Sequence, residues 1–90
     1  MSAQDENFEH QLKISPVYFA RVLSNEKTFE ARFNDRDFQK GDFVSLNEYE
    51  NNNHTGNQID VQITYVLNGG QYGIKKGYCV FGFKRRYQSK

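Results

Sequence analysis

The chain has 90 residues, which is enough for one small domain. Hydrophobic residues make up 37% of it and aromatic residues 16%, too much apolar content for a disordered chain. The sequence contains no apolar run near the 18 residues of a transmembrane helix, and its polar, acidic start is unlike a signal peptide. We therefore expect a cytoplasmic protein without membrane contact, with a flexible lead-in over residues 1–7 and one domain over residues 8–90.

The formal net charge of +1 conceals an uneven distribution along the chain. Residues 1–60 hold 6 basic and 11 acidic side chains, a sum of −5, whereas residues 61–90 hold 6 basic and no acidic side chains, a sum of +6. The two ends of a small domain can simply differ in this way. The alternative interpretation is a basic surface that meets an anionic partner.

The first elements predicted in chain order are a strand and a helix. Apolar and polar residues alternate from Phe8 to Ile14, and this period of two predicts a strand. Ser15 and Pro16 fit the N-cap and first position of a helix of about ten residues, which ends at Asn25-Glu26. The residues of this helix expected to face the core are Pro16, Phe19, Val22 and Leu23.

Four further strands are predicted at residues 28–34, 43–50, 59–67 and 78–86, separated by turns and by a polar loop at 51–58. In the strand at 59–67, one face is expected to hold Ile59, Val61, Ile63, Tyr65 and Leu67. Short strands joined by turns usually close into a barrel, which removes exposed edges. We therefore expect an α+β fold with a small β-barrel of about five to six strands and one or two short helices.

The sequence shows no pattern typical of a metal site or of covalent catalysis. His10 lies on the apolar face of its strand and is predicted to be a core histidine, while His54 falls in the polar loop. Cys79 is the one cysteine, which excludes an internal disulfide, and its apolar strand predicts a packed, unreactive thiol. We expect no metal and no cofactor.

The most informative segment is KTFEARFNDR, residues 27–36. Glu30 and Arg32 are expected on the outer side of the predicted strand at 28–34. They could be a solvated charge pair worth well under ~1 kcal/mol. Alternatively, the cations, carboxylates and amide of this segment form a site in which arginine grips phosphate and the amide or carboxylate reads base edges.

Several motifs together resemble the ASCH domain of the PUA-like superfamily, in its small single-domain bacterial and phage branch. The resemblance runs from His10 to Phe83 and rests on LK-x-x-P-x-YF, K-x-FE-x-R-x-NDR, GD and EY, followed by Thr55-Gly56 and YGIKKGYCVFGF. Two positions depart from that branch. Asn25-Glu26-Lys27 replaces the usual Gly-x-Lys, and Asn57 stands where arginine is common.

The resemblance implies a PUA-like barrel that binds RNA or a modified nucleotide in a cleft over the K-x-x-E-x-R strand. In this hypothesis a base stacks on an aromatic residue such as Tyr49 or Tyr65. The alternative is that these tyrosines pack in the core with their hydroxyl groups hydrogen-bonded. By this analogy Lys27, Glu30 and Arg32 line the cleft, and the residues at its edge are Asn34, Asp35 and Arg36. Lys13 and Tyr49 complete the predicted binding residues. Protein partners are not predicted.

An enzyme is the alternative that the resemblance leaves open. Some ASCH-like proteins resemble nucleoside amidohydrolases that use a lysine and a threonine three residues later. Here Glu30 holds the position of that threonine, and a carboxylate cannot replace the hydroxyl nucleophile. A ribonuclease with Glu30 or Asp35 as base, and with Lys27 or Arg32 stabilising charge, is a further possibility.

Overall fold

The computed structural model describes residues 9–86, so Phe8 and the predicted lead-in at 1–7 lie outside the described part. The elements are β1 (His10–Ile14), α1 (Pro16–Leu23), β2 (Phe29–Phe33), β3 (Phe43–Glu50), β4 (Asn53–Asn68) and β5 (Tyr78–Arg85). The predicted order of one strand, one helix and four strands is thereby confirmed.

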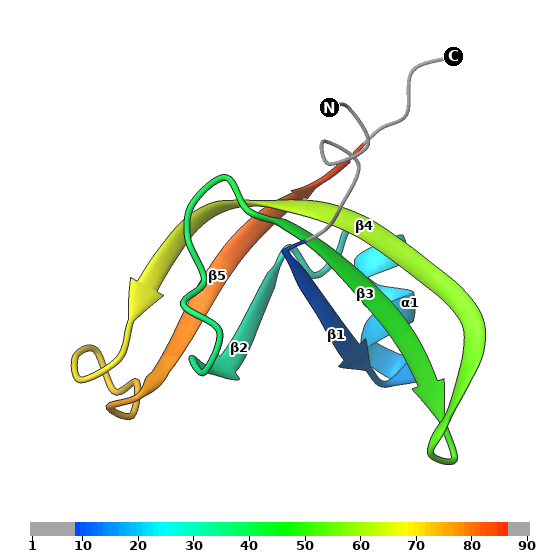
Figure 1. Ribbon diagram of the computed structural model, residues 1–90, viewed down its shortest axis with the longest axis horizontal. Helices are drawn as coiled ribbons and strands as arrows, with labels where there is room; N and C mark the ends of the chain where they lie inside the picture. Colours follow the sequence, from blue (N-terminus) through cyan, green and yellow to red (C-terminus); the bar gives the residue numbers. More distant parts are fainter. Residues whose placement is uncertain (1–8, 87–90) are drawn as a thin grey trace.

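The five strands form one sheet in the order β1-β3-β4-β5-β2. β1 runs parallel to β3, and the other neighbouring strands are antiparallel. The sheet curves into an arch with α1 on its concave side (Figure 1). Within residues 9–86 no ladder joins the edge strands β1 and β2, so the sheet is a half-barrel with an open seam. The α+β class is confirmed, but the expected closed barrel is an open one.

Helix α1 begins as predicted and ends earlier. Ser15 is the N-cap and Pro16 is the first helical residue. After the C-cap Ser24, Asn25 has a φ of 67°, a left-handed conformation that asparagine tolerates better than most residues. The backbone N–H groups of Asn25 and Glu26 donate to the carbonyls of Val22 and Arg21, which closes the helix in a Schellman motif. Asn25 thus replaces the glycine that the resemblance leads one to expect.

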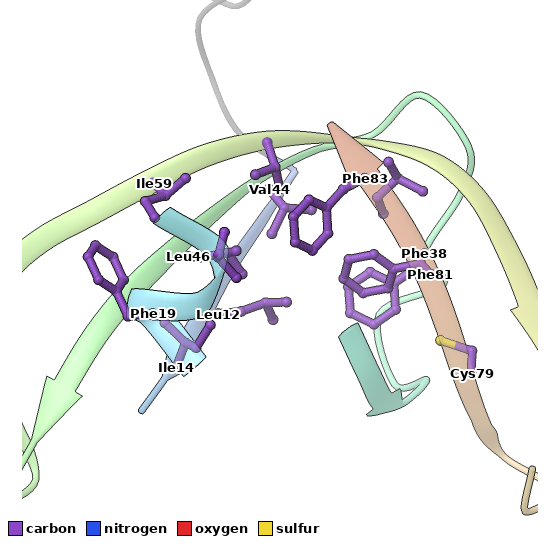
Figure 2. Packing of buried hydrophobic residues seen from close by; sticks show 13 residues of the cluster. Leu12, Ile14, Phe19, Phe38, Val44, Leu46, Ile59, Cys79, Phe81 and Phe83 are labelled. Carbon is purple, nitrogen blue, oxygen red and sulfur yellow. The ribbon is translucent and has the colours of Figure 1, made fainter. Parts of the chain in front are cut away.

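The core fills the concave side of the arch between the sheet and α1. Figure 2 shows Phe19 of α1 and Phe81 of β5 among the buried side chains directed into this space. His10 is buried as predicted, with Nε2 2.8 Å from Asp42 Oδ2 and its ring 4.7 Å from that of Phe38. Leu23, which was predicted to face the core, is instead 54% exposed because the helix ends there.

The predicted loop at 51–58 is wrong, because β4 already begins at Asn53. Asn51 and Asn52 both have positive φ values, 54° and 66°, which is the backbone of a type I′ hairpin turn. This turn joins β3 directly to β4, with Glu50 paired to Asn53. The polar composition of the segment therefore belongs to a solvated strand.

A β-bulge divides β4 into two parts with different faces. Ile63 pairs with Phe83 but Tyr65 pairs with Gly82, so the register shifts by one residue between them. The shift leaves Ile63 buried in the core and Tyr65 exposed on the convex side. The prediction of a single apolar face over residues 59–67 is correct up to Ile63 and wrong beyond it.

The helix present in the described range, α1, has eight residues and is too short to cross a bilayer.

Candidate functional site

The side chains of β2 face the opposite way from the prediction. Glu30 is buried, with a side chain only 8% exposed, and lies on the concave side of the sheet with Arg32. Phe29 and Phe33 are exposed on the convex side. The expectation that Glu30 and Arg32 occupy an outer, solvated face is therefore wrong, and both groups lie at the open seam between β1 and β2.

Glu30 connects two cations. Lys27 Nζ donates to Glu30 Oε2 at 2.9 Å, and Arg32 Nε donates to Glu30 Oε1 at 3.4 Å. Lys27 Nζ also donates to the carbonyl of Phe29 at 2.7 Å. We call these three side chains, Lys27, Glu30 and Arg32, the seam triad. Because the carboxylate is buried and both cations are part-exposed, the triad presents its positive charges to solvent.

Two members of the seam triad, Glu30 and Arg32, line a hollow of ≈ 410 Å³. Arg32 Nη2 donates to the main-chain carbonyl of Lys13, which places the guanidinium across the seam from β2 to β1. Ser15 and Tyr18 line the same hollow from the start of α1, and the Tyr18 ring centroid is 5.2 Å from Lys27 Nζ. The hollow is shallow and largely open to solvent.

Lys13 joins the seam to a second group of side chains. Its Nζ lies 4.7 Å from the centre of the Tyr49 ring, and the centroids of the Tyr49 and His54 rings are 4.1 Å apart. Two further hollows, of ≈ 460 and 430 Å³, adjoin this group, and Lys13 lines both of them as well as the seam hollow. The side chains of both groups include one carboxylate, Glu30, and three cations, a formal sum of 3 − 1 = +2, with Lys13, Lys27 and Arg32 as the cations. Lys13 alternates with the buried residues of β1 and lies on the convex side, whereas Glu30 and Arg32 lie on the concave side.

Three predicted site residues lie outside this cluster. Asn34 follows the far end of β2, where its Oδ1 accepts from the Phe38 N–H at 3.1 Å and thereby stabilises the turn after β2. Asp35 and Arg36 form an exposed pair with 3.8 Å between Oδ1 and Nε. The structure therefore brings together Lys13, Lys27, Glu30, Arg32 and Tyr49 of the predicted set. Tyr65, the other predicted stacking residue, lies on the convex side.

Sequence reasoning missed Ser15, Tyr18 and His54 at this site. Ser15 was assigned only a capping role, yet its side chain makes no capping hydrogen bond. Tyr18 lies off the core face of the predicted helix, and an exposed aromatic in such a position is the one signal that could have indicated it. His54 could not be paired with Tyr49 while residues 51–58 were assigned to a loop.

The cysteine of β5 lies beside the site, because Cys79 pairs with Arg32 across the β2–β5 ladder, but its thiol is packed in the core. Cys79 is fully buried in β5, and desolvation by burial raises the pKa of its thiol, which confirms the predicted packed cysteine. Within residues 9–86 no group of three or more His, Cys, Asp and Glu side chains could hold a metal ion.

The fold and the site define a class of protein: a small α+β half-barrel with a charged seam between its edge strands. Residues 9–83 match a family described as "Domain of unknown function (DUF3850)". The match covers most of the chain and the whole seam, and the chain belongs to this family.

A curated relative comes from a bacteriophage. The "Uncharacterized 12.9 kDa protein in GpA 3'region" of Escherichia phage P2 is 35% identical to the chain over 57 residues. The matched part is 63% of this chain and 52% of the phage protein, so the chain spans about half the length of that relative.

Proposed function

We propose that this half-barrel is a PUA-like, ASCH-type module that binds RNA or a modified nucleotide at its open seam. The observation that carries the proposal is the seam triad: a buried carboxylate holds one lysine and one arginine, and the carboxylate and the arginine line an open hollow between β1 and β2. The resemblance of the K-x-x-E-x-R strand to ASCH domains supports the same assignment.

The side chains present match the parts of a nucleotide. Arg32 and Lys27 supply charge for a phosphate, and an arginine guanidinium can grip two phosphate oxygens at once. Tyr18 borders the hollow and offers a ring face to a base taken out of its stack. Both oxygens of Glu30 are engaged by cations, so in this proposal the carboxylate fixes the positions of Lys27 and Arg32.

Lys13 and Tyr49 extend the proposed binding surface beyond the seam. The Lys13 ammonium group lies over the Tyr49 ring, and Lys13 is exposed to solvent. It can therefore contact a second phosphate of the same RNA strand. A strand of RNA that passes the seam would then contact two separated positive groups. Such contacts release counterions and make the affinity fall as salt rises.

The test measures the affinity for a fluorescein-labelled single-stranded RNA of about ten nucleotides, between about 50 and 200 mM salt. The variant Lys27→Gln/Glu30→Gln/Arg32→Gln removes all three charges together, so no buried carboxylate is left without a partner. We expect it to weaken binding about tenfold or more at low salt, and to reduce the slope of log affinity against log salt by roughly 0.7 for each lost phosphate contact. Lys13→Ala should have a smaller effect in the same direction.

The matched control is Lys40→Gln, which removes an exposed cation outside the seam. We expect its affinity to stay within about twofold of the wild type. Undetectable binding at low salt, or equal affinity for the wild type and the triple variant, would contradict the proposal. Turnover of the labelled RNA, or release of the acyl group from an acylated nucleoside, would replace binding by catalysis.

A further inference from the structure

The convex side of the sheet carries an apolar face that the core does not use. Its members come from β2, β4 and β5, and we call them the outer aromatic face: Phe29, Phe33, Tyr65, Leu67, Tyr78 and Val80. The register aligns them across the three strands, with Phe33 opposite Tyr78 and both Tyr65 and Phe29 opposite Gly82. The four aromatic side chains are 41–64% exposed. Contiguous exposed apolar surface of this kind marks an interaction site.

The other half of the same convex side has a different character. There Gln58 Nε2 donates to Ser45 Oγ at 3.0 Å and to Asp60 Oδ1 at 2.8 Å, so polar side chains cover β3 and the first part of β4. The contrast begins at the bulge in β4, which turns Tyr65 outward. Between Tyr78 and Phe83, β5 carries apolar side chains on both faces, and charged residues follow at Lys84 and Arg85.

Cations lie near the outer aromatic face, and beside Tyr65 one hollow is lined by both Lys40 and Asp37. Lys75 Nζ is 5.9 Å from the centre of the Tyr78 ring, and Lys84 is exposed further along β5. The sequence from residue 61 to residue 86 contains no acidic residue, and Glu30 of β2 points to the concave side. An isologous contact between two copies of the chain would bring these cations against one another. A polyanion that also carries aromatic rings would complement this face in two ways: its negative charge matches the lysines, and its rings can stack on the aromatic side chains.

We infer that the outer aromatic face is a stacking surface for single-stranded nucleic acid. Exposed aromatic residues on a sheet stack two or three bases in other sheet-based readers of single strands, and flanking cations neutralise the phosphates. Phe29 and Phe33 are four residues apart on β2, and three strands span about 10 Å, so the face has room for bases of that number. This inference extends the proposed function but does not require the seam triad. Phe33 and Tyr78, at one end of the outer aromatic face, also line the seam hollow, whereas Tyr65 does not, so variants of Tyr65 separate the two surfaces.

The experiment measures anisotropy of labelled oligouridylate and oligothymidylate of about ten nucleotides with variants of Tyr65. Tyr65→Phe keeps the ring and should bind within about twofold of the wild type, whereas Tyr65→Leu keeps only apolar bulk and should weaken binding by about five- to tenfold. Tyr65 is 64% exposed, so neither change disturbs the core. Lys84→Gln should reduce the salt slope by roughly 0.7, and Arg21→Gln, an exposed cation of α1 on the concave side, should not.

The outcomes separate the two surfaces. Equal affinity of Tyr65→Leu and Tyr65→Phe, with loss of binding in the triple seam variant, would overturn the outer aromatic face and leave the seam in place. Weaker binding by Tyr65→Leu than by Tyr65→Phe, with full binding retained in the triple seam variant, would support binding at the outer aromatic face and contradict binding at the seam. A wild-type protein that binds neither oligonucleotide at low salt overturns both. Concentration-dependent dimers in sedimentation, lost in Tyr65→Ser but retained in Tyr65→Leu, would assign the face to a second copy of the chain.

Discussion

Glu30 is the residue on which the seam depends, because it holds two cations through one buried carboxylate. Lys27 and Arg32 lie on opposite oxygens of this group, and their side chains are 15% and 26% exposed. Removing the charge leaves two part-buried cations without a counterion. The resulting loss of stability is smaller than for a fully buried ion pair, because water still reaches both cations.

Glu30→Gln should therefore lower the free energy of unfolding by about 1–3 kcal/mol. Glu26→Gln is the matched control, since Glu26 pairs with Arg21 at 3.1 Å but both side chains are more than half exposed. This control should cost less than ~1 kcal/mol. Urea unfolding of the two variants measures both values, and equal losses would contradict the structural role of Glu30.

Cys79 provides a second test at the scale of one residue. Its thiol is buried and its pKa is raised by desolvation, so the reactive thiolate is disfavoured in the folded protein. We expect an aromatic disulfide reagent to label Cys79 only after unfolding in urea. Rapid labelling of the folded protein at neutral pH would show that β5 is not packed as described.

The same shift predicts the pH dependence of stability. A raised thiol pKa in the folded state means that, above the ordinary pKa of a thiol, the unfolded chain loses its proton before the folded one does. The contribution of the Cys79 thiol to the free energy of unfolding is therefore fully present at neutral pH and decreases as the solution becomes more alkaline. In the Cys79→Ser variant, the free energy of unfolding should therefore fall less between neutral and alkaline pH than in the wild type. Urea unfolding across the pH range measures this difference.

At the scale of elements, the turn after β4 depends on the absence of a side chain at Gly69. A Cβ there would lie 2.1 Å from the Lys75 carbonyl oxygen and 2.7 Å from that of Tyr78, and both atoms are backbone. Gly69→Ala should therefore destabilise the protein by about 1–3 kcal/mol, as overpacking does. Gly82→Ala is the control, because its Cβ would meet the nearest atom at 3.4 Å, and it should change stability by less than about 1 kcal/mol. A comparison of thermal midpoints tests the difference.

The strands also show where prediction from sequence stops. The period of two over residues 28–34 placed β2 correctly, but the rule that apolar residues face inward assigned the wrong face. The rule fails because β2 is an edge strand whose Phe29 and Phe33 lie on the convex side, while a charged residue, Glu30, is buried. Similarly, the bulge at Tyr65 leaves no mark in a run of apolar residues, and only the pairing with Gly82 reveals it.

The candidate site was predictable to the extent that it follows the sequence of β2. Lys27, Glu30 and Arg32 are neighbours along the chain, so one motif was enough to group them. Tyr18 joins them only because α1 lies beside the seam, and this contact depends on the tertiary fold. Arg36 shows the opposite error, since closeness in sequence to Arg32 did not bring it to the same surface.

At the scale of the whole molecule, the half-barrel presents different chemistry on its seam and on its convex side. The seam lies between two unpaired edges, where exposed strands usually invite further pairing. Here the Arg32 side chain crosses from β2 to the Lys13 carbonyl, which blocks part of that edge. The basic part of the sequence also forms one part of the sheet. The segment 61–86 contains no acidic residue and forms β5, half of β4 and the positions of Lys75 and Lys84 beside the outer aromatic face.

The most direct test of the seam as a binding site is an NMR titration of ¹⁵N-labelled Tyr65→Leu protein with single-stranded RNA. This variant reduces the contribution of the outer aromatic face, so the remaining shift changes report on the seam. We predict that the largest amide shifts fall on residues 13–18 and 27–32 and decrease at high salt. Shifts confined to other residues, or no shifts at millimolar RNA, would contradict the account.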